Sequence, residues 1–140
     1  MKTRFSSLVT LKKNKMQESE QALTKVNLAL SNAKSALEES YAFLDDIEIP
    51  QTGSMSALIG NRLLLSSQRD LIQHNKEWIE YAQKQVEQAR EQLKKDTIEY
   101  EKFKYLEMEE IKKIIKKQKE QEAKDLDEVA LMTYAKKDNL

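Results

Sequence analysis

The sequence has no cysteine, only one proline and only two glycines in 140 residues. Without cysteine the chain has no disulfide framework, no thiolate nucleophile and no cysteine-based zinc site, and it fits a reducing compartment. With so little proline and glycine, few positions force a helix to end. Lysine, glutamate, glutamine, leucine and alanine dominate the composition, and clusters of strand-favouring residues are nearly absent. The composition therefore favours long helices.

Long apolar runs are also missing. Apolar runs such as Leu63-Leu64-Leu65 are short, whereas a transmembrane helix needs about 20 apolar residues. The basic amino-terminal stretch is interrupted by Ser6, Ser7 and Thr10, which is not typical of a signal peptide. The 24 basic and 24 acidic residues give a net charge of zero, so no overall field attracts nucleic acid or anionic lipid. We expect a cytoplasmic protein without membrane insertion or nucleic-acid binding.

Recognisable catalytic motifs are absent from the sequence. No glycine-rich phosphate loop and no set of nucleophile, base and orienting group can be assembled. His74 is the only histidine, and it has neither a cysteine nor a second histidine with which to share a metal ion. We expect a protein that is not an enzyme and that binds no cofactor or metal.

Two stretches carry apolar residues at alternating steps of three and four, the heptad spacing of a coiled coil. The first seam consists of Phe5, Val9, Lys12, Met16, Ser19, Leu23, Val26, Leu30, Ala33, Leu37, Ser40, Leu44 and Ile47. The second seam consists of Leu58, Asn61, Leu65, Gln68, Ile72, Asn75, Ile79, Ala82, Val86, Ala89, Leu93, Asp96, Tyr100 and Phe103. Each seam predicts one helix that packs along its apolar edge.

The residues that break helices are concentrated between the two seams. Pro50 cannot continue a helix, Gly53 can adopt a left-handed conformation, and Ser54 or Ser56 can cap a new helix. We therefore predict an all-α fold, an antiparallel two-helix coiled-coil hairpin that forms a single domain over residues 1–140. Its first helix spans about 3–48, the bend about 49–55 and the second helix about 56–136.

Folding the seams about this bend gives a predicted register. Met16 then lies opposite Ala89 and Ala33 opposite Ile72, so that large side chains face small ones. In the same register the amides of Gln68 and Asn75 face leucines of the first helix. Gly60 weakens the second helix by about 1 kcal/mol relative to alanine.

The second helix is predicted to extend well beyond the start of the first. Apolar residues recur along this extension, namely Tyr100, Phe103, Ile111, Ile114, Ile115, Leu126, Val129 and Met132. An apolar stripe without a partner inside the chain indicates an external partner, with Ile111 and Ile115 among its candidate contacts. Lys112, Lys113, Lys116, Lys117 and Lys119 could instead bind anions, although Glu109–Lys113 and Lys116–Glu120 have the spacing of ordinary helix ion pairs.

Both ends of the chain resemble the flagellar export protein FliJ family. The stretches are RFSSLVTLKKNKMQESEQAL at the start and KEQEAKDLDEVALMTYAKK near the end. The resemblance implies a helical hairpin that works as a stalk, similar to the central γ subunit of rotary ATPases. It also implies three partners: the flagellar type III export ATPase, the cytoplasmic part of the membrane export gate, and export chaperones.

The resemblance also assigns residues to two partner-binding ends. Phe5, Leu8, Leu11, Leu126 and Val129 match the end that engages the ATPase. Leu37, Tyr41, Leu63 and His74, in the half near the bend, are the counterparts of the gate-contacting surface. The implied location is the cytoplasmic side of the inner membrane at the flagellar base.

Three other functions remain open from the sequence. The chain could be a generic coiled-coil tether or dimerising rod, or the equivalent stalk of a related injection-type secretion system. The lysine cluster could bind a membrane or nucleic acid. A tether whose apolar end packs against a second copy of the chain would be a dimer, whereas an export stalk should be monomeric when free.

Overall fold

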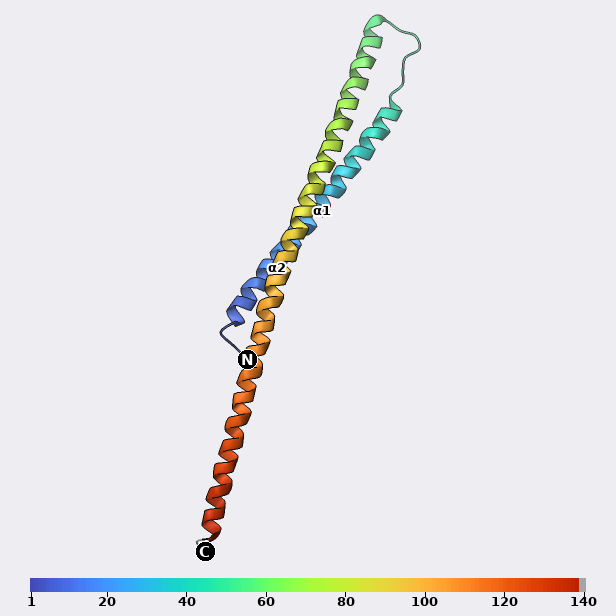
Figure 1. Cartoon of the computed structure of the whole chain (residues 1–140). Helices are drawn as coiled ribbons and strands as arrows, with labels where there is room; N and C mark the ends of the chain where they lie inside the picture. The colour runs from blue at the N-terminus through green and yellow to red at the C-terminus, as the bar shows by residue number, and fades with distance from the viewer. Residues whose placement is uncertain (139–140) are drawn as a thin grey trace. The chain divides into compact units, whose positions relative to one another are not determined.

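The computed structural model describes residues 1–138 and contains two long helices (Figure 1). Helix α1 spans Ser6–Asp46 and helix α2 spans Met55–Asp138. No strand occurs in this range. The two helices pack against each other and run antiparallel, because Ser19 of α1 contacts Asp96 of α2 whereas Ser40 contacts Gln68. The prediction of an all-α helical hairpin is confirmed.

The hairpin divides into two compact units, and both helices contribute to each. The terminal unit comprises Met1–Lys15 and the part of α2 from Thr97 onward. The bend unit comprises Met16–Asp96, including the connection between the helices. Each unit is described separately below.

A capping arrangement at Thr3 starts α1. The Thr3 side-chain oxygen accepts a hydrogen bond of 3.1 Å from the Phe5 N–H, and the Thr3 N–H donates to the Ser6 hydroxyl at 2.8 Å. These reciprocal bonds satisfy backbone groups that a helix end leaves unpaired, as in a capping box. The sequence pattern missed this cap, although a threonine three residues before a serine is a compatible signal.

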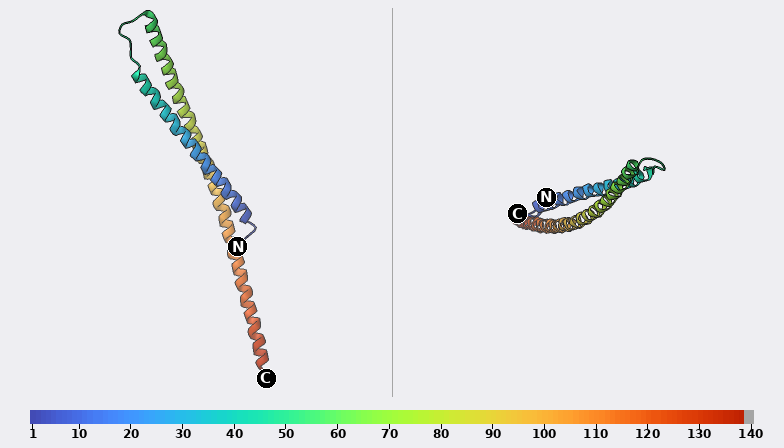
Figure 2. Two further views of the ribbon diagram at one scale, coloured as in Figure 1. Left: turned by 180° about the vertical axis from the view of Figure 1, so that it is seen from behind. Right: turned by 90° about the horizontal axis from the view of Figure 1, so that it is seen from above.

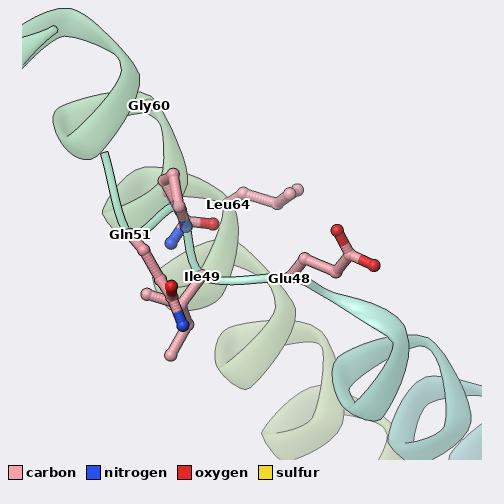
Figure 3. A pocket seen from close by; sticks show the side chains of 7 residues that line it. Glu48, Ile49, Gln51, Gly60 and Leu64 are labelled. Carbon is pink, nitrogen blue, oxygen red and sulfur yellow. The ribbon is translucent and has the colours of Figure 1, made fainter. Parts of the chain in front are cut away.

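The connection runs from Ile47 to Ser54, and Ser54 caps α2. The Ser54 hydroxyl accepts a hydrogen bond of 3.3 Å from the Ala57 N–H, so Ser54, and not Ser56, is the capping residue. Gly53 does not have a positive φ, which contradicts the expected left-handed conformation. Figure 3 shows Ile49 and Gln51 lying against the first turns of α2 near Gly60, so the connection follows α2 instead of turning tightly.

The predicted seams form the contact between the helices. Every residue of the first seam and every residue of the second except Leu58 is buried or half-buried. The most buried apolar side chains are Ala33, Ile72, Ala82 and Val86. Because most of these side chains are small, the helices pack closely but bury little apolar area per layer.

Two polar clusters interrupt the seam of the bend unit. The hydroxyl of Ser19 donates a hydrogen bond to Asp96. Near the bend, the Asn75 amide donates to the Ser40 hydroxyl at 2.6 Å, and the Gln68 amide donates to the Ser40 carbonyl at 2.8 Å. Within residues 1–138 no buried side-chain nitrogen or oxygen lacks a hydrogen-bond partner. Burial of these groups therefore carries little desolvation penalty.

The predicted register is wrong by about one heptad. That register placed Ser19 opposite Val86 and Ser40 opposite Leu65, whereas the structure pairs them with residues further along α2. A shift of one heptad keeps every seam residue in the seam, so apolar burial does not distinguish the two registers. Hydrogen bonding distinguishes the two registers, because a buried amide such as that of Gln68 or Asn75 costs about 1–3 kcal/mol when it has no hydrogen-bond partner.

Polar contacts hold the amino-terminal residues in the terminal unit. The Ser6 hydroxyl donates to Glu107 at 3.3 Å, and Arg4 forms an ion pair of 3.7 Å with Glu110. Lys12, a seam residue, pairs with Glu99 at 3.6 Å while its amine lies 5.6 Å from the centre of the Phe103 ring. In Figure 1 and in the left view of Figure 2, the amino terminus lies beside α2, and α2 continues beyond it.

Candidate functional site

The last part of α2 presents apolar side chains to solvent. From Lys116 to Lys137 every residue is exposed, so no other described part of the chain covers this stretch. The apolar side chains here are Leu126, Val129, Leu131, Met132 and Tyr134, all more than half exposed. Leu126 and Val129 line a shallow hollow with Glu122 and Asp125. We call residues 116–137 the free end.

The three amino-terminal candidates differ in accessibility. Phe5 is half-buried in the seam, and the Arg4 guanidinium lies 5.0 Å from the centre of its ring. Leu8 and Leu11 are exposed on the outer side of α1, with 38% and 60% of their surface accessible. Phe5 is therefore placed to hold α1 against α2, whereas Leu8 and Leu11 can contact another molecule.

Ile111 and Ile115 lie between the amino-terminal contacts and the free end. Ile111 is half-buried, as is Ile114, while Ile115 is exposed. The accessible candidates of the terminal unit are therefore Leu8 and Leu11 on α1 and Ile115, Leu126 and Val129 on α2.

The four candidates of the bend half differ in their surroundings, and no hollow among residues 1–138 is lined by two of them. Leu37 is half-buried in the seam, and Tyr41 lies with its ring centre 5.9 Å from the Lys76 amine. Leu63 lines one hollow and His74 lines another, with no residue in common. Tyr41, Leu63 and His74 are exposed and can therefore contact another molecule.

Sequence reasoning missed several exposed apolar residues. At the free end these are Leu131 and Tyr134, which neighbour the predicted Val129 and Met132. In the bend unit they are Phe43, Ile59, Leu64, Leu71 and Tyr81. The heptad spacing of Leu64, Leu71 and Trp78 was a usable signal, because it marks a second stripe beside the seam.

The lysine cluster forms fewer ion pairs than its sequence indicated. Lys112 pairs with Glu109 at 3.4 Å. The expected pairs Glu109–Lys113 and Lys116–Glu120 are not among the contacts of the described residues, and the five lysines are exposed. The cluster is therefore a solvated basic face of α2.

Neither a membrane span nor a metal cluster is found in residues 1–138. Neither helix contains a segment long and apolar enough to cross a membrane. In the same range, no three or more His, Cys, Asp or Glu side chains gather so that they could hold a metal ion.

Comparison of the chain with models of protein families identifies its family. The family model described as "Flagellar FliJ protein" matches residues 1–139. Comparisons with curated proteins and with solved structures found no match. The family match covers nearly the whole chain, and it agrees with the helical hairpin found in the structure. The chain therefore belongs to the flagellar FliJ family and is a component of the flagellar type III protein export apparatus.

Proposed function

We propose that the chain is a non-enzymatic stalk of flagellar export. Its terminal unit binds the export ATPase, and its bend unit faces the cytoplasmic part of the export gate. By these contacts it assists export and the cycling of export chaperones. The protein works in the cytoplasm, held at the inner membrane at the flagellar base through its partners.

One observation carries this proposal: no residue of the described range 1–138 covers the free end. Leu126, Val129, Leu131, Met132 and Tyr134 are exposed together on a single helix. Exposed apolar groups cost free energy in water, and a binding partner recovers it. A helix with such residues is suited to insertion between the subunits of a larger assembly.

The acidic residues beside these side chains add a requirement for the partner. Glu122 and Asp125 line the same hollow as Leu126 and Val129. The ATPase surface that receives the free end should therefore combine an apolar depression with lysine or arginine at its rim. Binding energy that differs between states of the ATPase ring would let the stalk promote assembly or cycling.

Point variants of the free end test the proposal. Leu126→Asp and Val129→Asp should each weaken binding of the purified export ATPase by at least about tenfold, which corresponds to about 1.4 kcal/mol. Leu28→Asp is the matched control, because Leu28 is also exposed, at 62%, and lies in the bend unit. Equal binding by all three variants would remove the free end from the ATPase contact.

A generic dimerising rod is the alternative function. Its free end would pack against that of a second copy, so the free protein would have twice the mass of one chain. We expect a monomer in sedimentation at micromolar concentration, with a change of state only after the ATPase is added. A dimer that Val129→Asp dissociates would favour the dimerising rod.

A further inference from the structure

A second apolar stripe runs along α2 in the bend unit, beside the seam. Leu64, Leu71 and Trp78 follow at intervals of seven residues, each one position before a seam residue. Heptad spacing keeps the three side chains on one side of the helix. They are 45%, 45% and 39% exposed, so α1 does not cover them. The stripe therefore lies along one flank of the helix pair.

Helix α1 contributes to the same flank. Ala36 and Phe43, also seven residues apart, line a hollow of about 530 Å³ together with Leu71. The polar cluster of Ser40, Gln68 and Asn75 lines the same hollow, which therefore spans both helices. We call Ala36, Phe43, Leu64, Leu71 and Trp78 the side groove.

The side groove continues along α2 beyond the end of this hollow. Trp78 lines a second hollow, of about 480 Å³, together with His74, Glu77 and Tyr81. Two aromatic side chains beside a row of leucines form a surface that a single helix can cover. The space between two helices of a coiled coil is where a third helix packs in a three-helix bundle.

The charges around the side groove have one sign. Glu39 lines the first hollow and Glu77 the second, and no lysine or arginine among the described residues lines either. The cations of this part of α2 lie elsewhere. Arg62 and Arg69 line a separate hollow, and Lys76 lies over the Tyr41 ring.

We infer that the side groove binds an amphipathic helix of another protein, with lysine or arginine flanking its apolar heptad positions. The apolar floor requires a helix with its own apolar stripe, and the acidic rim selects a basic one. A second copy docking through the same groove would bring two acidic rims together, and their like charges would repel. None of the five side-groove residues is a gate-facing candidate, although His74 lines the second hollow beside Trp78. The test of the side groove does not depend on the ATPase.

Trp78 provides a direct probe of occupancy, because it is the only tryptophan in the chain. The full-length protein is titrated with a tryptophan-free helical peptide of about three heptads, with leucine at the apolar positions and lysine beside them. A second peptide carries glutamate in place of every lysine. The lysine peptide should shift the Trp78 emission saturably and bind on the order of tenfold more tightly than the glutamate peptide, with less difference at high salt.

Variants separate the side groove from the rest of the surface. Leu71→Glu should abolish the response while circular dichroism shows an unchanged helix content. Leu28→Glu, at an exposed α1 position outside the groove, should retain it. The double variant Glu39→Lys with Glu77→Lys should reverse the preference and favour the glutamate peptide, because the rim charge is then inverted.

Three outcomes would overturn the inference. The first is no saturable Trp78 response to the lysine peptide, or equal affinity for the two peptides. The second is full binding by Leu71→Glu. The third is a change of Trp78 emission and of molecular mass with protein concentration alone, which would assign the groove to a second copy of this chain.

Discussion

At the scale of single residues, the two glycines have different environments and neither is required by backbone conformation. Gly60 lies inside α2, and a β-carbon added there would meet no atom within 4 Å. Gly53 lies in the connection, where a β-carbon would lie 3.5 Å from that of Ala57, an ordinary contact. Both positions can therefore accept alanine without strain.

Gly60→Ala should stabilise the protein by about 1 kcal/mol, because alanine has the higher helix propensity. Gly53→Ala, the comparison outside a helix, should give a smaller gain of about 0.5 kcal/mol by restricting the unfolded chain. Urea unfolding monitored by circular dichroism measures both. A loss of stability in Gly60→Ala would contradict the open space that the structure shows at that position.

Asn75 tests the polar cluster near the bend. Its amide donates to the Ser40 hydroxyl at 2.6 Å and to the Ala36 carbonyl at 3.3 Å. Asn75→Ala should lower the free energy of unfolding by about 1–2 kcal/mol, because lost hydrogen bonds outweigh the better helix propensity of alanine. Gln73→Ala, at an exposed position on the same helix, should change it by less than about 0.5 kcal/mol.

At the scale of the helices, Ser54 and Ser56 form a matched pair for testing where α2 begins. Ser54→Ala removes the hydroxyl that accepts from the Ala57 N–H. It should cost about 1 kcal/mol, the typical value of an N-cap. Ser56→Ala should be neutral within about 0.5 kcal/mol, since Ser56 is exposed inside the first turn. Equal losses at both positions would contradict the assigned cap.

The heptad pattern predicted which residues of each helix face the other, but not how the helices align. Ser19 illustrates the difference: its place in the seam follows from spacing, whereas its pairing with Asp96 does not. Repeats of seven look alike to a pattern search, so any shift by one heptad preserves the pattern. The hydrogen bonds of Ser40, Gln68 and Asn75 distinguish the registers, together with a connection that follows α2.

At the scale of the whole molecule, exposed apolar side chains identify the two candidate sites, the free end and the side groove. The free end was predictable, because Leu126 and Val129 lie beyond any residue with which the first seam could pair. The side groove was not predicted, since Phe43 and Leu71 are far apart in sequence and line one hollow only once the helices are aligned. Which residues of α1 lie beside which residues of α2 depends on the register of the helix pair. The heptad pattern of the sequence does not determine that register.

Hydrogen–deuterium exchange of the full-length chain, alone and with the export ATPase, tests whether the free end is the part that the ATPase binds. In the free chain, amides of residues 116–137 should exchange faster than those of the paired part of α2, because no tertiary contact protects this stretch. Adding the ATPase should slow exchange in residues 116–137 and leave the connection unchanged. Protection confined to the bend unit, with no change at the free end, would show that the ATPase does not bind residues 116–137.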